Sequence, residues 1–177
     1  AYRDAYLSHR KNGIYGEMMF AAVQAAAFVE HDPGKLIQIG LSEIPCDCRL
    51  ARWVKRCLKW CDRYPDFESC MDRLESELGD MHAVHTINNA LICVIAMIYG
   101  RMDTTKTPCI AVMCGLDTDC NGATVGSVVG AIAGRANFGG ALADRLNDLV
   151  KPNMLEFQEV TMRELAERTA KVWKSLR

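Results

Sequence analysis

Two acidic residues with metal-ligand spacing are the clearest chemical feature of the sequence. Asp117 and Asp119 are separated by one residue, follow Gly115 and precede a segment of small residues. In an extended loop, two such carboxylates can converge on one hard divalent cation. Residues 115–124 contain no Lys, Arg or His that would neutralise them. Because a pair of like charges is costly to bury without a cation or proton between them, the pattern predicts a cation site.

Three interpretations of this segment are open from the residues alone. The first is a solvated loop in which Asp119 or Asn121 caps the following helix. The second is an EF-hand calcium loop, because Asp117, Asp119, Asn121 and Gly122 fit its first six positions. That loop needs a glutamate at its twelfth position, where this chain has Val128. The third is a catalytic metal site whose other ligands lie elsewhere in the fold.

The segment that follows the carboxylates has a glycine at every fourth position from Gly122 to Gly134. Each glycine costs up to about 1 kcal/mol in a helix relative to alanine. We therefore expect a helix over residues 122–134 whose glycine stripe is approached closely by another helix or by a ligand.

Helices are predicted nearly throughout the rest of the chain. Residues 84–99 are apolar almost all round, which indicates a buried central helix. Asp66 can cap a helix that ends before Gly79, and Pro33 suits the first turn of a short helix. No alternating pattern indicates a strand, so the predicted fold class is all-α. The predicted helices span residues 16–30, 35–41, 47–64, 66–78, 84–99, 105–113, 122–134 and 161–176.

Length and charge restrict the class of protein. A chain of 177 residues suits one domain, and a net charge of −1 gives no general electrostatic case for nucleic acid or an anionic membrane. The longest apolar runs, residues 90–99 and 123–133, are shorter than the roughly 20 residues that cross a bilayer. The first ten residues do not resemble a signal peptide. Because the chain begins without a methionine, we expect it to be a fragment, and residues 151–153 are its one weak internal boundary.

The nine cysteines favour a reduced, cytoplasmic chain over a disulfide framework, because their number is odd and several lie among apolar residues. Structural zinc is the alternative. The chain has no Cys-x-x-Cys pair, and the nearest approaches to one are Cys46 with Cys48 and Cys57 with Cys61.

Residues 115–134 closely resemble the C-terminal signature of the ADP-ribosylglycohydrolases. That signature is Gly-Asp-x-Asp-Thr, followed by a helix of small residues with a Gly-Ala-x-x-Gly ending. Two further segments agree with the family in order and spacing. Residues 84–90 (VHTINNA) are similar to the helix start that precedes the signature, and residues 12–17 (NGIYGE) are similar to its Asn-Gly substrate loop. The resemblance extends to about residue 140.

The resemblance implies an all-α orthogonal multi-helix bundle with a central cleft that binds two Mg²⁺ or Mn²⁺ ions. Asp117 and Asp119 occupy the carboxylate positions of the metal site. Cys120 replaces the usual threonine ligand, and a neutral thiol is a poor ligand for a hard ion. The family's other ligands come from an N-terminal Thr-Asp-Asp motif, which is absent from this sequence. Residues 1–177 are therefore expected to be the C-terminal part of a single domain whose N-terminal part is missing, and inactive alone.

The implied reaction is metal-dependent hydrolysis of the glycosidic bond between ADP-ribose and a protein side chain or small molecule. The implied partners are such an ADP-ribosylated protein or ADP-ribose compound and the missing N-terminal segment. No catalytic acid or base is identified. The residues implied in substrate binding are Asn12, Gly13, Tyr15, Gly16 and His85. Each also has an ordinary structural explanation as part of a loop, a helix cap or the core.

Two other functions stay open. A non-catalytic ADP-ribose-binding or structural member of the same fold is favoured by Cys120, which departs from the family's ligand set. A zinc- or cluster-binding helical protein would account for the cysteines. His82 and His85 lie one helical turn apart and could form a metal pair, although the start of a helix, with one histidine hydrogen-bonded in the core, explains them better.

Overall fold

The computed structural model describes residues 1–138 and 144–176. The chain divides into two compact units, Ala1–Arg135 and Ala136–Arg177, each of which is described by itself.

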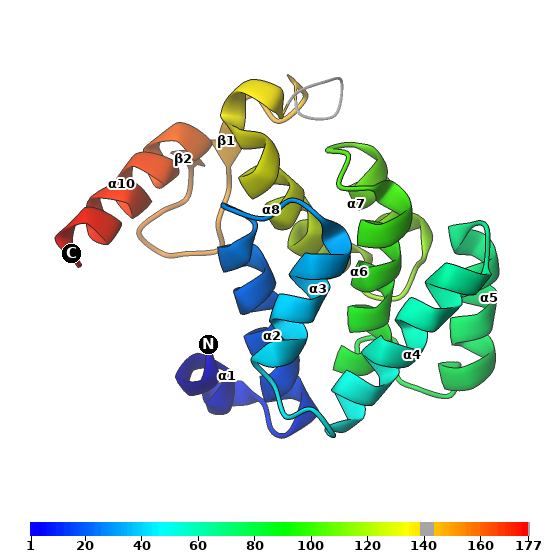
Figure 1. The fold of residues 1–177 in the computed structure, drawn as a ribbon. Coiled ribbons are helices and arrows are strands. Elements are labelled where there is room, and N and C mark those ends of the chain that lie inside the picture. Colours follow the sequence, from blue (N-terminus) through cyan, green and yellow to red (C-terminus); the bar gives the residue numbers. More distant parts are fainter. Residues whose placement is uncertain (139–143, 177) are drawn as a thin grey trace. The chain divides into compact units, whose positions relative to one another are not determined.

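The first unit is built from helices, as the sequence predicts (Figure 1). Its last helix kinks at Gly134, where φ is 66°, and continues past the boundary between the units. The helices are α1 (Tyr2–Ser8), α2 (Asn12–Ala26), α3 (Pro33–Ser42), α4 (Arg49–Arg63), α5 (Phe67–Leu78), α6 (Thr86–Gly100), α7 (Lys106–Met113) and α8 (Thr118–Asn137).

Helix α6 is the centre of the core. Residues 87–97 are buried without interruption, and α6 packs against α2, α3, α4, α5 and α7. Such a helix buries apolar surface on every side, and each buried Leu or Ile side chain contributes roughly 1.5–3 kcal/mol. The prediction of a buried central helix over residues 84–99 is confirmed. The two polar residues in this run, Asn88 and Asn89, need hydrogen-bond partners inside the protein.

Side-chain caps begin several helices where the sequence indicated. The Asp32 carboxylate accepts a hydrogen bond from the backbone N–H of Lys35 at 2.8 Å, and Pro33 occupies the first turn of α3. The Asp66 carboxylate accepts one from the N–H of Ser69 at 2.7 Å, and Gly79 follows the end of α5.

The start of the chain differs from the prediction. Helix α1 was not expected, and α2 begins at Asn12 and ends at Ala26 where residues 16–30 were predicted. Lys11, with φ of 50°, turns the chain between the two helices. Gly13 lies inside α2, close to the end of α1. A Cβ at this position would come 2.9 Å from Cδ2 of the His9 side chain, and this contact favours glycine there.

The second unit contains a short ribbon and one helix. Strand β1 (Leu149–Val150) pairs antiparallel with β2 (Val160–Thr161), and α10 (Met162–Ser175) follows. The Thr161 hydroxyl accepts a hydrogen bond from the N–H of Glu164 at 3.0 Å, which confirms the predicted cap. The ribbon was not predicted, because two residues are too few for an alternating pattern. The weak boundary expected at residues 151–153 lies between the two strands.

The glycine stripe of α8 is only partly approached by other helices. A Cβ at Gly122 would lie 3.2 Å from Val112 Cγ2 of α7, whereas one at Gly126 would have no described atom within 4 Å. Another helix therefore makes the expected close approach at Gly122 and not at Gly126, where the approach of a ligand stays a prediction. Among the described residues, no helix is long and apolar enough to cross a membrane.

Candidate active site

The predicted metal ligands lie together at the start of α8. One ligand atom each from Asp117, Asp119 and Cys120 can be chosen so that all three lie within 4.8 Å of one another. Asp117 is half-buried, and Asp119 and Cys120 are exposed. Carboxylate oxygens at this spacing are the donor set that hard divalent cations prefer, so the residues fit the magnesium or manganese that the signature implies. The thiol is the one donor that does not suit such ions.

A tight turn before the helix orients the first carboxylate. Gly115 and Leu116 both have left-handed backbone conformations, with φ of 76° and 57°. A non-glycine residue in this region costs of order 1–3 kcal/mol and is found where the surrounding structure imposes it, often at functional sites. The Asp117 carbonyl then accepts a hydrogen bond from the N–H of Asn121 at 2.9 Å. The turn thus places Asp117 at the N-terminus of α8, where the partial positive charge of the helix stabilises carboxylates.

Asn89 of the central helix holds this turn in place. Its Oδ1 accepts hydrogen bonds from the Asp117 backbone N–H at 3.2 Å and from Asn121 Nδ2 at 2.8 Å. Its Nδ2 donates to the carbonyls of Ala83 at 2.7 Å and His85 at 3.0 Å. One buried amide therefore joins the start of α6 to the start of α8. The position of the carboxylates depends on Asn89 although it carries no charge.

A buried thiol completes this network. Cys93 Sγ lies 3.6 Å from Asn121 Oδ1 and can donate to it. Burial raises the pKa of the Cys93 thiol to about 12, so it stays protonated at neutral pH. Cys93 thus supplies a neutral donor beside the carboxylates and adds no negative charge to them.

The exposed thiol of Cys120 is also protonated in the protein without metal. Its hydrogen bond with the Asp117 carboxylate, its partial desolvation and the nearby charges of Asp117 and Asp119 raise its pKa. A metal ion would have to displace that proton before sulfur could become a strong ligand. Asp117 and Asp119 are consequently better candidates for metal ligands than Cys120.

A small cavity of about 190 Å³ opens beside the carboxylate turn. Asp117, Cys120, Asn121 and Thr124 line one side of it, at the start of α8. Cavities that enclose a whole drug-sized ligand usually measure about 300–1,000 Å³, so this one matches a fragment such as a sugar ring. The remaining lining residues come from α6, α2 and the segments before them: His9, Phe20, Val84, Thr86, Asn89, Ala90 and Cys93.

The Asn-Gly segment lies behind this cavity. Asn12 Oδ1 accepts a hydrogen bond from the N–H of Leu50 at 3.0 Å and so caps α4 from the start of α2. Gly13 contacts His9, and Gly16 is so close to the Thr86 hydroxyl that a Cβ could not be accommodated. Both contacted residues line the cavity. The two glycines therefore let α2 approach residues that face the cavity.

The other two residues of the predicted substrate set have structural contacts of their own. Tyr15 is half-buried and packs against the core. His85 is the N-cap of α6, and its Nδ1 accepts a hydrogen bond from the N–H of Ile87 at 3.1 Å. His82 is exposed, and its Nδ1 accepts from the N–H of Val84 at 3.3 Å. Neither histidine belongs to a group of three potential metal ligands in the described part of the chain. Roles for Asn12, Gly13, Tyr15, Gly16 and His85 in substrate binding stay predictions.

Sequence reasoning missed several residues of this site. His9 and Thr124 carry no local pattern that sets them apart from surface residues. Asn89 did carry a signal, because an amide among apolar helix residues requires internal partners. Spacing alone does not reveal that those partners lie 28 to 32 positions away.

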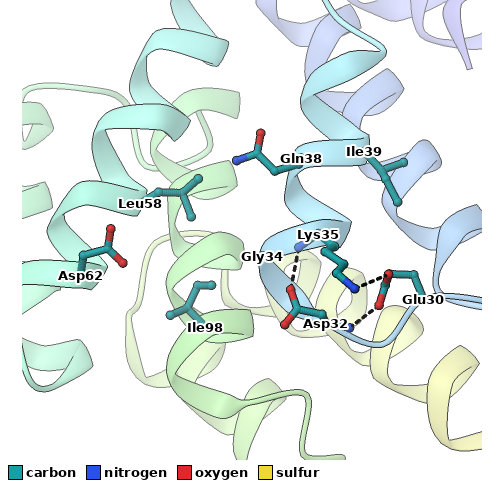
Figure 2. Close-up of a pocket in the computed structure, with 9 residues that line it drawn as sticks. All are labelled: Glu30, Asp32, Gly34, Lys35, Gln38, Ile39, Leu58, Asp62 and Ile98. Carbon is teal, nitrogen blue, oxygen red and sulfur yellow. Dashed lines mark hydrogen bonds and ion pairs between the residues drawn. The ribbon is translucent and has the colours of Figure 1, made fainter.

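A wider groove of about 720 Å³ lies beside α3, α4 and α6 (Figure 2). Its acidic residues on the α3 side already have partners. Glu30 accepts hydrogen bonds from the backbone N–H groups of His31 and Asp32, and its carboxylate lies 3.5 Å from Lys35 Nζ. Asp32 caps α3. The hydrogen bonds from the N–H groups of Asp32 and His31 lower the pKa of Glu30. The two carboxylates stabilise the turn before α3, so a bound cation is not needed to explain them.

Comparison with known families agrees with the geometry of the carboxylate site. The model of the ADP-ribosylglycohydrolase family matches residues 1–176. The chain belongs to this family of all-α glycohydrolases. Separate searches of the curated proteins and of the solved structures gave no significant match.

Proposed function

We propose that the chain supplies the Asp117 and Asp119 side of a metal-dependent site that hydrolyses the glycosidic bond of ADP-ribose attached to a protein side chain or small molecule. The observation that carries this proposal is the convergence of Asp117, Asp119 and Cys120 within 4.8 Å beside a cavity. Nine free thiols favour a reducing, cytoplasmic setting for the protein.

Two divalent cations, Mg²⁺ or Mn²⁺, are the cofactors that this donor set suits. When bound, they would supply positive charge that orients hydroxyl groups and stabilises charge in the transition state. Asp117 and Asp119 hold the cations in this proposal, and Asn89 keeps Asp117 in position. Because the sequence contains no Thr-Asp-Asp motif, the complementary ligands would come from another segment of the same protein, and these 177 residues alone would not turn over substrate.

The bond that breaks joins the anomeric carbon of the ribose to the acceptor atom. Water supplies the oxygen that replaces the acceptor, and the acceptor leaves with a proton. The anomeric carbon passes through a cation-like state. The cavity beside Asp117 has the size of one sugar ring, with Thr86 and Thr124 available as polar contacts for its hydroxyl groups.

A manganese titration of the 177-residue chain tests the metal site. We expect Asp119→Asn to weaken Mn²⁺ binding at least about tenfold, because it removes a charged ligand. The control variant Asp80→Asn removes one exposed acidic charge that belongs to no cluster of potential ligands among the described residues. It should leave binding unchanged. Equal affinity in the Asp119 variant and the control would contradict the proposed site.

An activity assay tests the reaction. The protein with its Thr-Asp-Asp segment is incubated with peptides that carry ADP-ribose on arginine or serine and with O-acetyl-ADP-ribose, and free ADP-ribose is measured by chromatography. We expect release from at least one substrate and its loss in Asp119→Ala. Unchanged release by that variant would refute the assignment.

The alternative is a non-catalytic ADP-ribose-binding or structural member of the same fold. The observation in its favour is Cys120, a protonated thiol at the third ligand position. It predicts that ADP-ribose binds, that no substrate is hydrolysed, and that Cys120→Thr alone does not create activity.

A further inference from the structure

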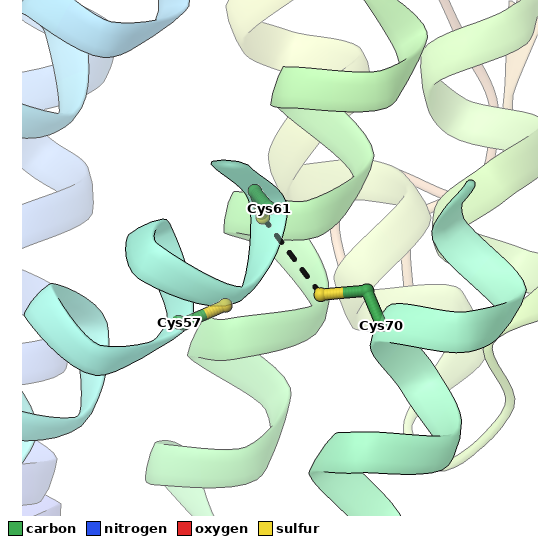
Figure 3. A group of neighbouring side chains, drawn as sticks. All are labelled: Cys57, Cys61 and Cys70. Atoms are coloured by element: carbon green, nitrogen blue, oxygen red, sulfur yellow. Dashed lines mark hydrogen bonds between the residues drawn. The ribbon is translucent and has the colours of Figure 1, made fainter. Parts of the chain in front are cut away.

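Three cysteines that belong to no part of the carboxylate site converge in the core of the first unit (Figure 3). Cys57 and Cys61 lie one turn apart on α4, and Cys70 lies on α5. Their Sγ atoms are all within 4.8 Å of one another. Cys57 and Cys70 are buried, whereas Cys61 is half-buried, so the group has a side from which an ion can enter.

The spacing of the sulfur atoms is compatible with a metal site. A metal at about 2.3 Å from each of three sulfurs in one plane holds the sulfurs about 4.0 Å apart. The Sγ atoms of Cys61 and Cys70 are 3.9 Å apart. Figure 3 shows the three side chains directed toward a common centre from two helices. An ion could therefore be bound with little movement of the backbone.

We propose that Cys57, Cys61 and Cys70 form a binding site for one thiophilic cation, with monovalent copper as the ion of best fit. Soft thiolate ligands select copper(I), zinc and iron–sulfur clusters. Structural zinc requires four ligands, and the group within 4.8 Å contains only three from the described residues. Copper(I) accepts fewer ligands than zinc. Each thiol that coordinates releases its proton to solvent, and no electron transfer is involved.

The plain alternative is that the three thiols are small hydrophobic residues that fill the core. In that case we would not expect the three sulfur atoms to contact one another in preference to the carbon atoms of other core side chains. None of the other six cysteines shares a group of three potential ligands with a second cysteine among the described residues. The convergence of Cys57, Cys61 and Cys70 is the observation that a purely apolar role leaves unexplained.

Copper(I) titration under anaerobic conditions tests the proposal. The chain is titrated with copper(I) held by a chromogenic chelator, and transfer of the ion is followed by the loss of chelator absorbance. We expect one copper(I) ion to bind per chain. Cys61→Ser should weaken copper(I) binding at least about tenfold, because losing a direct ligand should cost at least as much affinity as losing an outer-shell partner. Cys109→Ser is the matched control, since Cys109 is also half-buried and lies outside the group.

Alkylation of the unaltered protein gives a second measurement that needs no variant. Copper(I) should slow the alkylation of Cys61 and leave that of the exposed Cys46 unchanged, as read by mass spectrometry of peptides. Equal copper affinity in Cys61→Ser and Cys109→Ser, or no protection of Cys61, would overturn the site. Zinc that binds tighter than copper(I) with the same dependence on Cys61 would overturn the choice of ion. None of these outcomes depends on the proposed hydrolase activity.

Discussion

Removing the Asn89 side chain should destabilise the protein and loosen the carboxylate turn together. Asn89→Ala removes five hydrogen bonds, two accepted from Asp117 and Asn121 and three donated to the carbonyls of Ala83 and His85 and to Asn88 Oδ1. Each contributes about 0.5–1.5 kcal/mol net. Water can replace part of this where the chain is exposed, so we expect the free energy of unfolding to fall by about 2–4 kcal/mol.

A double-mutant cycle isolates the bond between the two amides. Asn121→Ala should cost about 1–2 kcal/mol, and the double variant should cost about 1 kcal/mol less than the sum, because both single variants break the same bond. Urea denaturation followed by circular dichroism measures all four proteins. Costs that add within about 0.5 kcal/mol would refute the coupling.

Manganese affinity separates positioning from stability. Asn89→Ala should weaken Mn²⁺ binding although Asn89 offers no charged ligand, because the backbone of Asp117 loses its anchor. Leu36→Ala in α3 is the control, since truncating this fully buried residue should cost a similar 2–5 kcal/mol. If both variants bind Mn²⁺ as the wild type does, Asn89 supports the fold only.

Three further variants test other features. Gly115→Ala should lower the free energy of unfolding by about 1–2 kcal/mol, because φ is 76° there. Gly126→Ala lies in a helix and should raise the free energy of unfolding by up to about 1 kcal/mol. Neither site has a described atom near the added Cβ, so equal effects of the two variants in urea denaturation would contradict this reasoning. Thr107→Val should raise the free energy of unfolding by about 1 kcal/mol, because the Thr107 hydroxyl is buried without a hydrogen-bond partner among the described residues. A loss of stability would show that this hydroxyl has a hydrogen-bond partner. Hydrogen bonds from the hydroxyl and N–H of Ser69 lower the pKa of Asp66 in the folded protein. The Asp66 carboxylate therefore stabilises the fold above its unfolded pKa of about 3.9, and this stabilisation is lost as the pH falls through its pKa in the folded protein. Asp66→Asn caps the helix without titrating, and its melting temperature should fall less between about pH 5 and pH 2 than that of the wild type.

The sequence predicted the helices best where their ends have local chemical causes. Asp66 and Gly79 bound α5 as expected, since a cap and a terminating glycine act through neighbouring residues. The start of α2 was misplaced because Asn12 and Gly13 resemble loop residues. At Gly13 and Gly16, the side chains of His9 and Thr86 from outside the helix occupy the space that a Cβ would need, and local sequence patterns do not show such contacts.

The proximity of the carboxylates in the candidate site was predictable, and the residues that support them were not. Asp117 and Asp119 stand in one short segment with a known ligand pattern, and the structure brings their oxygens together. The supporting residue Asn89 lies in a different helix, so its contacts depend on tertiary packing. The same holds for the thiol group, in which Cys57 and Cys61 share a helix face but Cys70 comes from the next helix.

The central place of α6 has a consequence for the synthesis of the chain. Helices α2, α3, α4 and α5 all bury apolar side chains against α6, which lies after them in the sequence. A nascent chain that has not yet reached Thr86 therefore exposes the parts of four helices that α6 covers in the folded protein. Such partly made chains are prone to aggregate.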